Sequence, residues 1–219
     1  MKKNTSNAPT HRTQIRRLSE LADYNKQAVF DIVDAAYVCH IAFSDGENFH
    51  SIPTACWRID DFLYIHGSNG GRLTKALLGG AQACISIALI DGLVLAKSAF
   101  SHTMNYRSVV IYGVFELVTG NENKTNAMDA FMEKIASGRQ YEARAGNENE
   151  LAATSVMRIS LSEAAAKISK NGPVDKPEDV DLPVWAGILP LKVIQEQPIP
   201  LGKQLVPDPK YVLEWGKGN

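Results

Sequence analysis

Residues 37–66, YVCHIAFSDGENFHSIPTACWRIDDFLYIH, decide the fold class that this sequence predicts. They contain three β-prone runs separated by two turn signals, namely Tyr37–Phe43, Asp45-Gly46, Phe49–Arg58, Asp60-Asp61 and Phe62–His66. Asp-Gly between runs of β-branched and aromatic residues is a strong hairpin signal. Pro53 cannot donate a hydrogen bond to a β-ladder, so it marks a bulge, an edge or a gap beside a ligand. The stretch therefore predicts short antiparallel strands.

The rest of the chain adds a few helices and four further strands. Helical spacing of apolar residues predicts one helix that Asp23 caps and another at Asn126–Ala136. The further strands are predicted at Cys84–Leu89, Ser108–Val118, Val156–Leu161 and Ala166–Ser169. Many short strands with helices at the edges favour a mainly β fold, a closed antiparallel β-barrel with peripheral helices. A β-sandwich is the alternative.

Composition excludes several classes of function. The 219 residues carry a net charge of −1, which provides no field to attract nucleic acid or an anionic membrane. Cys39, Cys56 and Cys84 lie far apart among apolar residues, so we interpret them as buried thiols in a reducing cytoplasm. The most apolar run, residues 83–96, contains Asp91 and is shorter than the roughly 20 residues that span a bilayer. We therefore predict a cytoplasmic protein without nucleic-acid or membrane partners.

Residues 66–75, called the cradle below, are the first candidate site. A strand ends at His66, passes through glycines and enters a helix that carries Arg72 and Lys75. Backbone N–H groups at such a turn, together with two cations, suit a phosphate group. The spacing is neither that of a Walker loop nor that of a dinucleotide fold, so a mononucleotide fits better. An ordinary glycine-rich turn is the alternative.

Residues 98–108, SAFSHTMNYRS, are the second candidate site. They gather hydroxyls, an imidazole, an amide, a phenol and a guanidinium immediately before a strongly apolar strand. A guanidinium that enters a β-barrel needs an anionic or hydrogen-bonding partner, so Arg107 indicates either a ligand or an internal salt bridge, for example with Glu116.

Other kinds of chemistry find no support in the sequence. His40 and His50 lack the short-range spacing of metal ligands, and we predict no metal site. No Ser-His-Asp or Cys-His arrangement stands out. Trp57 and Trp185 are of a type found more often in cores or interfaces than as ligand-stacking platforms.

Several segments together resemble one known family, that of pyridoxamine 5'-phosphate oxidase, in the branch with the nitroimidazole-resistance flavoproteins. The matching segments are Cys39–Phe43, Ile52-Pro53-Thr54 with Trp57, Leu63–Ser68, Asp91–Ala96, Ser98–Val110 and Leu182–Gly187. The resemblance extends from about Leu18 to Leu191. It divides the chain into a flexible arm (1–17), one domain (18–191) and a C-terminal extension (192–219).

The resemblance implies an FMN-binding split β-barrel that forms a homodimer, with two flavins in clefts between the subunits. In this family, strand residues line the flavin ring, the cradle holds ribitol and phosphate, the second candidate site lies near the ring or phosphate, and a partner tryptophan closes the cleft. The implied FMN-binding residues are Ile52, Pro53, Thr54, His66, Gly67, Ser68, Arg72, Lys75, Asn105, Tyr106, Arg107, Ser108 and Trp185.

Two departures from the family pattern matter. Relatives commonly have Ser before the phosphate-binding Arg and a basic or long residue after it, whereas this chain has Gly71 and Leu73. The vitamin-producing oxidases end in a basic substrate-binding tail, whereas residues 211–216 here read YVLEWG. Oxidation of pyridoxine phosphate is therefore not expected.

The resulting hypothesis is an FMN-dependent oxidoreductase that transfers electrons or hydride from reduced flavin to a small acceptor, such as a nitroaromatic or a quinone. His66 is the expected proton relay, because the pKa of histidine lies close to cellular pH. Arg107 is expected to stabilise the anionic reduced flavin. A non-catalytic flavin carrier or sensor is the alternative, because fold does not fix function. A third hypothesis replaces the flavin with haem.

Overall fold

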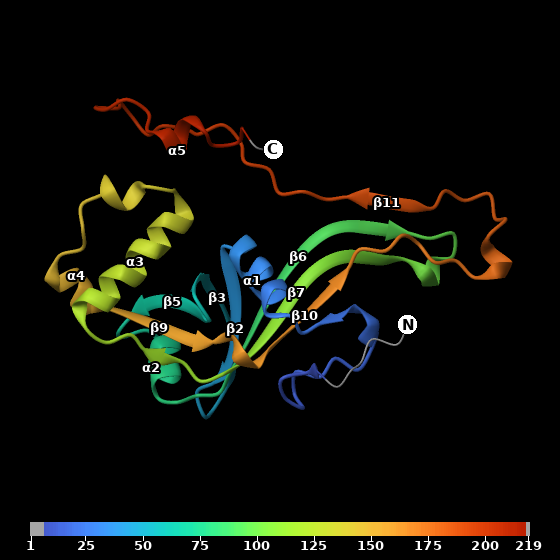
Figure 1. The fold of residues 1–219 in the computed structure, drawn as a ribbon, viewed down its shortest axis with the longest axis horizontal. Coiled ribbons are helices and arrows are strands. Elements are labelled where there is room, and N and C mark those ends of the chain that lie inside the picture. Colours follow the sequence, from blue (N-terminus) through green and yellow to red (C-terminus); the bar gives the residue numbers. More distant parts are fainter. Residues whose placement is uncertain (1–6, 218–219) are drawn as a thin grey trace.

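The computed structural model describes residues 7–217, so residues 1–6 of the predicted arm and 218–219 of the extension lie outside it. Two antiparallel sheets form the body, as Figure 1 shows. The larger sheet has the order β1-β10-β7-β6-β2-β3, with β11 pairing β6 further along. Its strands are β1 (Ala22–Asp23), β2 (Val38–Ser44), β3 (Phe49–Ala55), β6 (Ala83–Leu95), β7 (Thr103–Gly113), β10 (Ala164–Ser169) and β11 (Gly187–Pro190).

The smaller sheet has the order β4-β5-β9-β8. Its strands are β4 (Trp57–Ile59), β5 (Phe62–Ser68), β8 (Glu116–Leu117) and β9 (Thr154–Ser160). The helices are α1 (Lys26–Ala35), α2 (Arg72–Leu78), α3 (Asn121–Ile135), α4 (Glu148–Ala153) and α5 (Lys210–Leu213). No helix within residues 7–217 has the length and apolar character needed to cross a membrane.

The mainly β class is confirmed, but the sheets do not join into the predicted closed barrel. The run expected at Phe49–Arg58 divides at Cys56, where the chain passes from β3 in the larger sheet to β4 in the smaller one. The N–H of Cys56 donates to the carbonyl of Tyr37 (3.1 Å), which ends the β2–β3 ladder. After Cys56, the Trp57 indole packs in a second apolar cluster with Tyr64 and Val156, whereas Ile52 of β3 packs against the main core.

One apolar core joins the two sheets. The larger sheet contributes Ile41, Ile85 and Ile111, and the smaller one contributes Leu63 and Ile159, each at most 1% exposed. Helix α1 adds buried side chains to the same core. Burial alternates along β2, which directs its apolar side chains inward, whereas β5 and β9 each contain three consecutive buried residues.

Two helix boundaries differ from the prediction. Helix α1 is capped by Asn25, whose side-chain oxygen accepts from the N–H of Gln27 (3.0 Å), whereas Asp23 accepts from the N–H of Asn25 (2.9 Å). The N-cap of α1 is therefore Asn25, and Asp23 accepts a hydrogen bond from the backbone of that residue. Helix α3 begins at Asn121, five residues before the predicted start, because Gly120 with φ 85° ends the preceding segment.

Strands β6 and β7 form a long hairpin that extends to one end of the molecule in Figure 1. Both differ from their predicted bounds, since the polar residues that precede Ser108 already belong to β7 and pair with β6. Beyond β11 the chain runs back across the molecule as an extended segment and ends near α3 and α5. At the other terminus, Arg12 forms a salt bridge with Glu163 (2.6 Å), so this part of the predicted arm contacts the domain.

Helix α2 packs closely against β5. Thr74 and Leu77 are buried, and Leu77 belongs to the main core. A Cβ added at Gly67 would lie 2.7 Å from the Thr74 hydroxyl, whereas a Cβ at Gly70 would meet no atom within 4 Å. Glycine at position 67 is therefore what allows the helix to approach the strand so closely.

Gly67→Ala is expected to lower the free energy of unfolding by about 1–3 kcal/mol, because the added methyl group overpacks a buried contact. Gly70→Ala is the matched control, with an expected change within about 0.5 kcal/mol. Urea denaturation of both variants measures the difference. Equal stability of the two variants would contradict this account of α2 packing.

Candidate functional site

The cradle forms one wall of an open cavity of about 430 Å³. Asp45, Gly70, Arg72, Lys75 and Ala76 line it. Gly71 is the N-terminal cap of α2 and has no side chain to cap the helix, and its own N–H donates to the Ser68 carbonyl (3.0 Å). The first turn of α2 therefore borders the cavity without a capping side chain of its own.

The charges around this cavity suit an anion. Neither Arg72 nor Lys75 makes a side-chain hydrogen bond or ion pair with any residue between 7 and 217. Asp45 is the one carboxylate among the lining residues. Backbone N–H donation from Asn48, followed by the hydrogen bond to His50, lowers the pKa of Asp45 to about 2, so this group is ionised at neutral pH. Two cations against one carboxylate leave a net positive cavity.

The cavity also has room for a phosphate group at the turn. A Cβ added at Gly70 would meet no atom within 4 Å, and Gly70 lines the cavity together with Arg72 and Lys75. A phosphate at this point would receive charge-assisted hydrogen bonds from Arg72 and Lys75. The residues present therefore fit the phosphate of a nucleotide.

In the second predicted group, Asn105–Ser108 on β7, the side chains of Asn105, Arg107 and Ser108 form hydrogen bonds within the chain. Asn105 is buried and accepts from the hydroxyl of Ser169 (3.2 Å), and Ser108 donates to the carbonyl of Lys167 (3.2 Å). Arg107 donates two hydrogen bonds to Asp91 (2.9 and 2.8 Å). These bonds lower the pKa of Asp91.

The salt-bridge partner of Arg107 is thus Asp91, and the partner suggested from the sequence, Glu116, was wrong. Glu116 pairs instead with Arg158 (3.1 Å) in the smaller sheet. Arg107 and Asp91 lie across the β6–β7 hairpin beside the register shift that follows Ile90, which sequence periodicity did not reveal.

The two predicted groups do not meet within one chain. Helix α2 packs on β2 and β5, whereas Asn105–Ser108 pair with residues 88–92 of β6 and 167–169 of β10. In Figure 1, α2 lies near the smaller sheet, and the hairpin extends away from it. The cavity beside Arg72 contains no residue of β7.

His66 lies in an aromatic cluster rather than in the cradle cavity. Its ring is 5.0 Å from that of Phe131 and 5.8 Å from that of Trp57. Burial lowers the pKa of His66, so the ring is neutral at neutral pH, and its buried Nδ1 has no hydrogen-bond partner among residues 7–217. Successive side chains of a strand point to opposite faces, and Gly67 faces Thr74 of α2. The role of His66 as a proton relay stays a prediction.

The remaining predicted residues occupy β3 and the segment before β11. Pro53 lies on β3, the edge strand of the larger sheet, opposite His40 of β2. The missing N–H of Pro53 therefore breaks no ladder. Ile52 packs against the core, and Thr54 lies opposite Cys39. Trp185 is 61% exposed, and its ring covers Gly187, where an added Cβ would lie 2.7 Å away.

Three residues near these groups were missed by sequence reasoning. Asp45 was recognised as a turn residue, but the turn also carries it into the cradle cavity. Asp91 was seen as an interruption of an apolar run, and it is the partner of Arg107. Phe131 had only helical periodicity as a signal. Within residues 7–217, no three His, Cys, Asp or Glu side chains are arranged to hold a metal ion.

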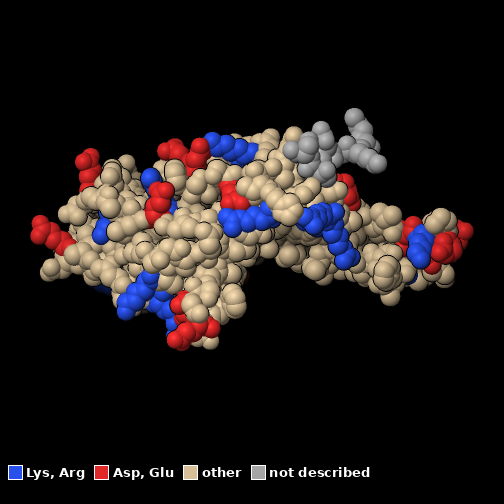
Figure 2. Space-filling view, turned by 90° about the horizontal axis from the view of Figure 1, so that it is seen from below, with Lys and Arg blue, Asp and Glu red and all other residues tan. Residues whose placement is uncertain are grey.

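Figure 2 shows one face of the molecule with its charged side chains. Positive and negative groups alternate there in small separate clusters, with uncharged surface between them. This face therefore carries no large patch of a single charge, in keeping with the net charge of −1 of the whole chain.

Comparison with known structures finds two that align over nearly the whole chain. The flavocytochrome Anf3 from Azotobacter vinelandii is 34% identical, with a TM-score of 0.90 over 95% of this chain and 98% of that one. The FAD and heme binding protein from Mycobacterium smegmatis is 30% identical, with a TM-score of 0.82 over 90% of this chain and 97% of that one.

More distant comparisons agree on the fold. A candidate 5-nitroimidazole antibiotic resistance protein from Bacteroides thetaiotaomicron is 22% identical, with a TM-score of 0.57 over 67% of this chain and 86% of that one. No curated protein sequence matches the chain. The family model described as pyridoxamine 5'-phosphate oxidase matches residues 25–168, more than half of the chain. This protein therefore belongs to the pyridoxamine 5'-phosphate oxidase family.

Proposed function

We propose that this protein is an oxidoreductase that binds a flavin nucleotide, with a flavin phosphate held in the cradle. The observation that carries the proposal is the pair of cations, Arg72 and Lys75, that line an open cavity and have no partner between residues 7 and 217. The two nearly full-length relatives support it, since one is a flavocytochrome and the other binds FAD.

FMN is the simplest nucleotide that the cradle fits, because a single phosphate satisfies two cations opposed by one carboxylate. The Mycobacterium smegmatis relative is described as binding FAD, which contains the same ribitol phosphate. We propose that the FMN unit occupies the cradle in either case.

We further propose a homodimer with the flavin between two subunits. The cradle and Asn105–Ser108 lie apart within one chain, so a site that uses both needs the second group from a partner. Trp185, which is largely exposed on the segment before β11, is available to close such a cleft. The three cysteines are free, in keeping with the proposed cytoplasmic setting.

The bound flavin would supply hydride or electron transfer, and the chain's own residues would orient it and exclude water. Arg107 is already neutralised by Asp91, so the pair contributes a directed guanidinium rather than a full free charge. His66 stays neutral because of burial and can accept a proton only at a cost. Nitroaromatics and quinones are the proposed acceptors. A flavin carrier or sensor without turnover is the competing function.

Haem is proposed as a second redox group, in addition to the flavin and not in its place. Of the two nearly full-length relatives, one is a flavocytochrome and the other binds haem as well as FAD. His11 contacts Arg16, His50 contacts Asp45 and His66 is enclosed by aromatic rings. His102 is exposed, and its Nδ1 lies 3.0 Å from the carbonyl of Ser98. A carbonyl there requires a proton on Nδ1, which leaves Nε2 as a free ligand atom.

Arg72→Ala is expected to weaken flavin binding by about 1–3 kcal/mol, since it removes a charge-assisted hydrogen bond to phosphate. Fluorescence titration of the apoprotein with FMN and with FAD measures the loss and identifies the preferred nucleotide. Arg144→Ala is the matched control, because its guanidinium pairs with Glu150 and does not line the cavity. Unchanged affinity in Arg72→Ala would remove the cradle from the site.

Turnover separates the enzyme from the carrier. Photoreduced protein mixed with a nitroaromatic or a quinone is expected to reoxidise faster than free reduced flavin at the same concentration, because the site orients the acceptor. Stopped-flow absorbance of the flavin band follows the reaction. A rate equal to that of free flavin would favour the carrier.

His102→Ala is expected to change the Soret and visible bands of haem-loaded protein, because His102 would hold the haem iron through its Nε2. Added imidazole should restore the original spectrum, because it replaces the missing ligand. His40→Ala serves as the control, since His40 is likewise exposed but lies on β2 and not in the turn before β7. A spectrum that His102→Ala leaves intact would exclude this residue as the ligand.

A further inference from the structure

Residues 191–209, called the strap below, connect β11 to α5 and contain no helix or strand. They are rich in apolar side chains that their own chain does not cover. Val193 is 90% exposed, Ile199 94%, Leu201 96% and Leu205 91%. Scattered single apolar residues are normal on a surface, but several large apolar side chains exposed to 90% or more along one segment are typical of an interaction site.

Both ends of the strap are fixed to the body. At its start, the N–H of Leu191 donates to the carbonyl of Asp91 (3.0 Å). Just beyond its end, the hydroxyl of Tyr211 donates to Glu142 and accepts from Arg139, each at 2.8 Å. The middle of the strap stands away from the sheets in Figure 1. The strap is therefore held at two points and is exposed between them.

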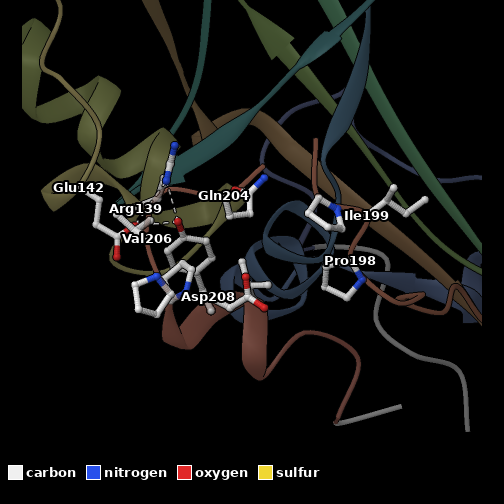
Figure 3. Close-up of a pocket in the computed structure, with 12 residues that line it drawn as sticks. Arg139, Glu142, Pro198, Ile199, Gln204, Val206 and Asp208 are labelled. Atoms are coloured by element: carbon white, nitrogen blue, oxygen red, sulfur yellow. Dashed lines mark hydrogen bonds and ion pairs between the residues drawn. The ribbon is translucent and has the colours of Figure 1, made fainter. Parts of the chain in front are cut away.

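A cavity of about 730 Å³ lies where the strap approaches the end of α3. Figure 3 shows Pro198 and Ile199 on one side of it, with Arg139, Glu142 and Val206 on the other. The polar groups of Arg139 and Glu142 are engaged with Tyr211, so the strap contributes mainly proline rings and aliphatic side chains. Its exposed surface suits an apolar partner.

The same chain carries an uncovered apolar surface of matching character. Met104, Leu93 and Leu189 lie side by side across β7, β6 and β11, and their exposed fractions are 48%, 36% and 45%. Ile90 on β6 is 45% exposed. Leu189 lies two residues before the strap, so this surface and the strap are continuous along the chain.

We propose that the strap packs against a second copy of this chain, with each copy offering its β6–β7–β11 surface to the strap of the other. A two-fold dimer covers both surfaces at once, because every copy has both. The strap contains Lys192, Lys203, Glu196 and Asp208, so its charges cancel and provide no attraction to an acidic or basic partner. The inference rests on the homodimer of the proposed function and names the segment that holds it together.

The test is the mass in solution of the flavin-loaded full-length chain and of a variant with Ile199→Asp, Leu201→Asp and Leu205→Asp. We expect the wild type to be a dimer and the variant to dissociate with a Kd at least about tenfold higher, since aspartates cannot be buried unpaired. Val174→Asp is the control, because Val174 is 78% exposed outside the strap. Circular dichroism verifies that each variant is folded.

A photo-crosslinking residue in place of Ile199 gives a second readout. Crosslinks between chains of dimer mass support the inference, and crosslinks confined to one chain overturn it. A variant that stays as dimeric as the wild type overturns the role of the strap but leaves the dimer and its flavin site standing. A monomeric wild type that still binds flavin overturns the dimer and the strap together, without touching the cradle.

Discussion

The contact between Gly67 and Thr74 is the constraint on which the candidate site depends. It sets how closely α2 can approach β5, and Leu77 then anchors the helix in the core shared by the two sheets. Arg72 and Lys75 project from this fixed helix toward the cavity that Asp45 borders from the β2–β3 turn. If α2 packed less tightly, both cationic side chains would be more mobile in solvent. A phosphate would then have to order them on binding, which costs free energy.

Much of the fold could be predicted from the sequence, because local signals and tertiary structure agree there. The Asp45-Gly46 turn, the strands around it and the helix after Gly71 all appear where the pattern places them. The prediction of a closed barrel was wrong, because the sequence pattern locates strands but does not show which strands pair with each other. The chain changes sheet at Cys56, and only the packing of Trp57 under α3 reveals this.

The candidate site was harder to predict, because it too depends on which distant segments the fold brings together. The cations of the cradle were found because they follow a recognisable turn. Asp45 was not linked to them, since it lies 27 residues before Arg72 in sequence and meets the cavity only through the fold. Arg107 was understood to need a partner, but the choice of Asp91 over Glu116 depends on the β6–β7 register and its irregularity after Ile90.

The long β6–β7 hairpin carries Asn105–Ser108 and also pairs with β11, the strand that leads into the strap. Beyond the core it is a narrow ribbon joined by β11 on one side and β10 on the other, and a face of it carries exposed Met104, Leu93 and Leu189. A ribbon of few strands gains stability mainly by burying an apolar face. A second copy would cover that face, bring Asn105–Ser108 toward a foreign cradle and give the strap a surface to lie on. The proposed homodimer would therefore account for the exposed hairpin face and the exposed strap together.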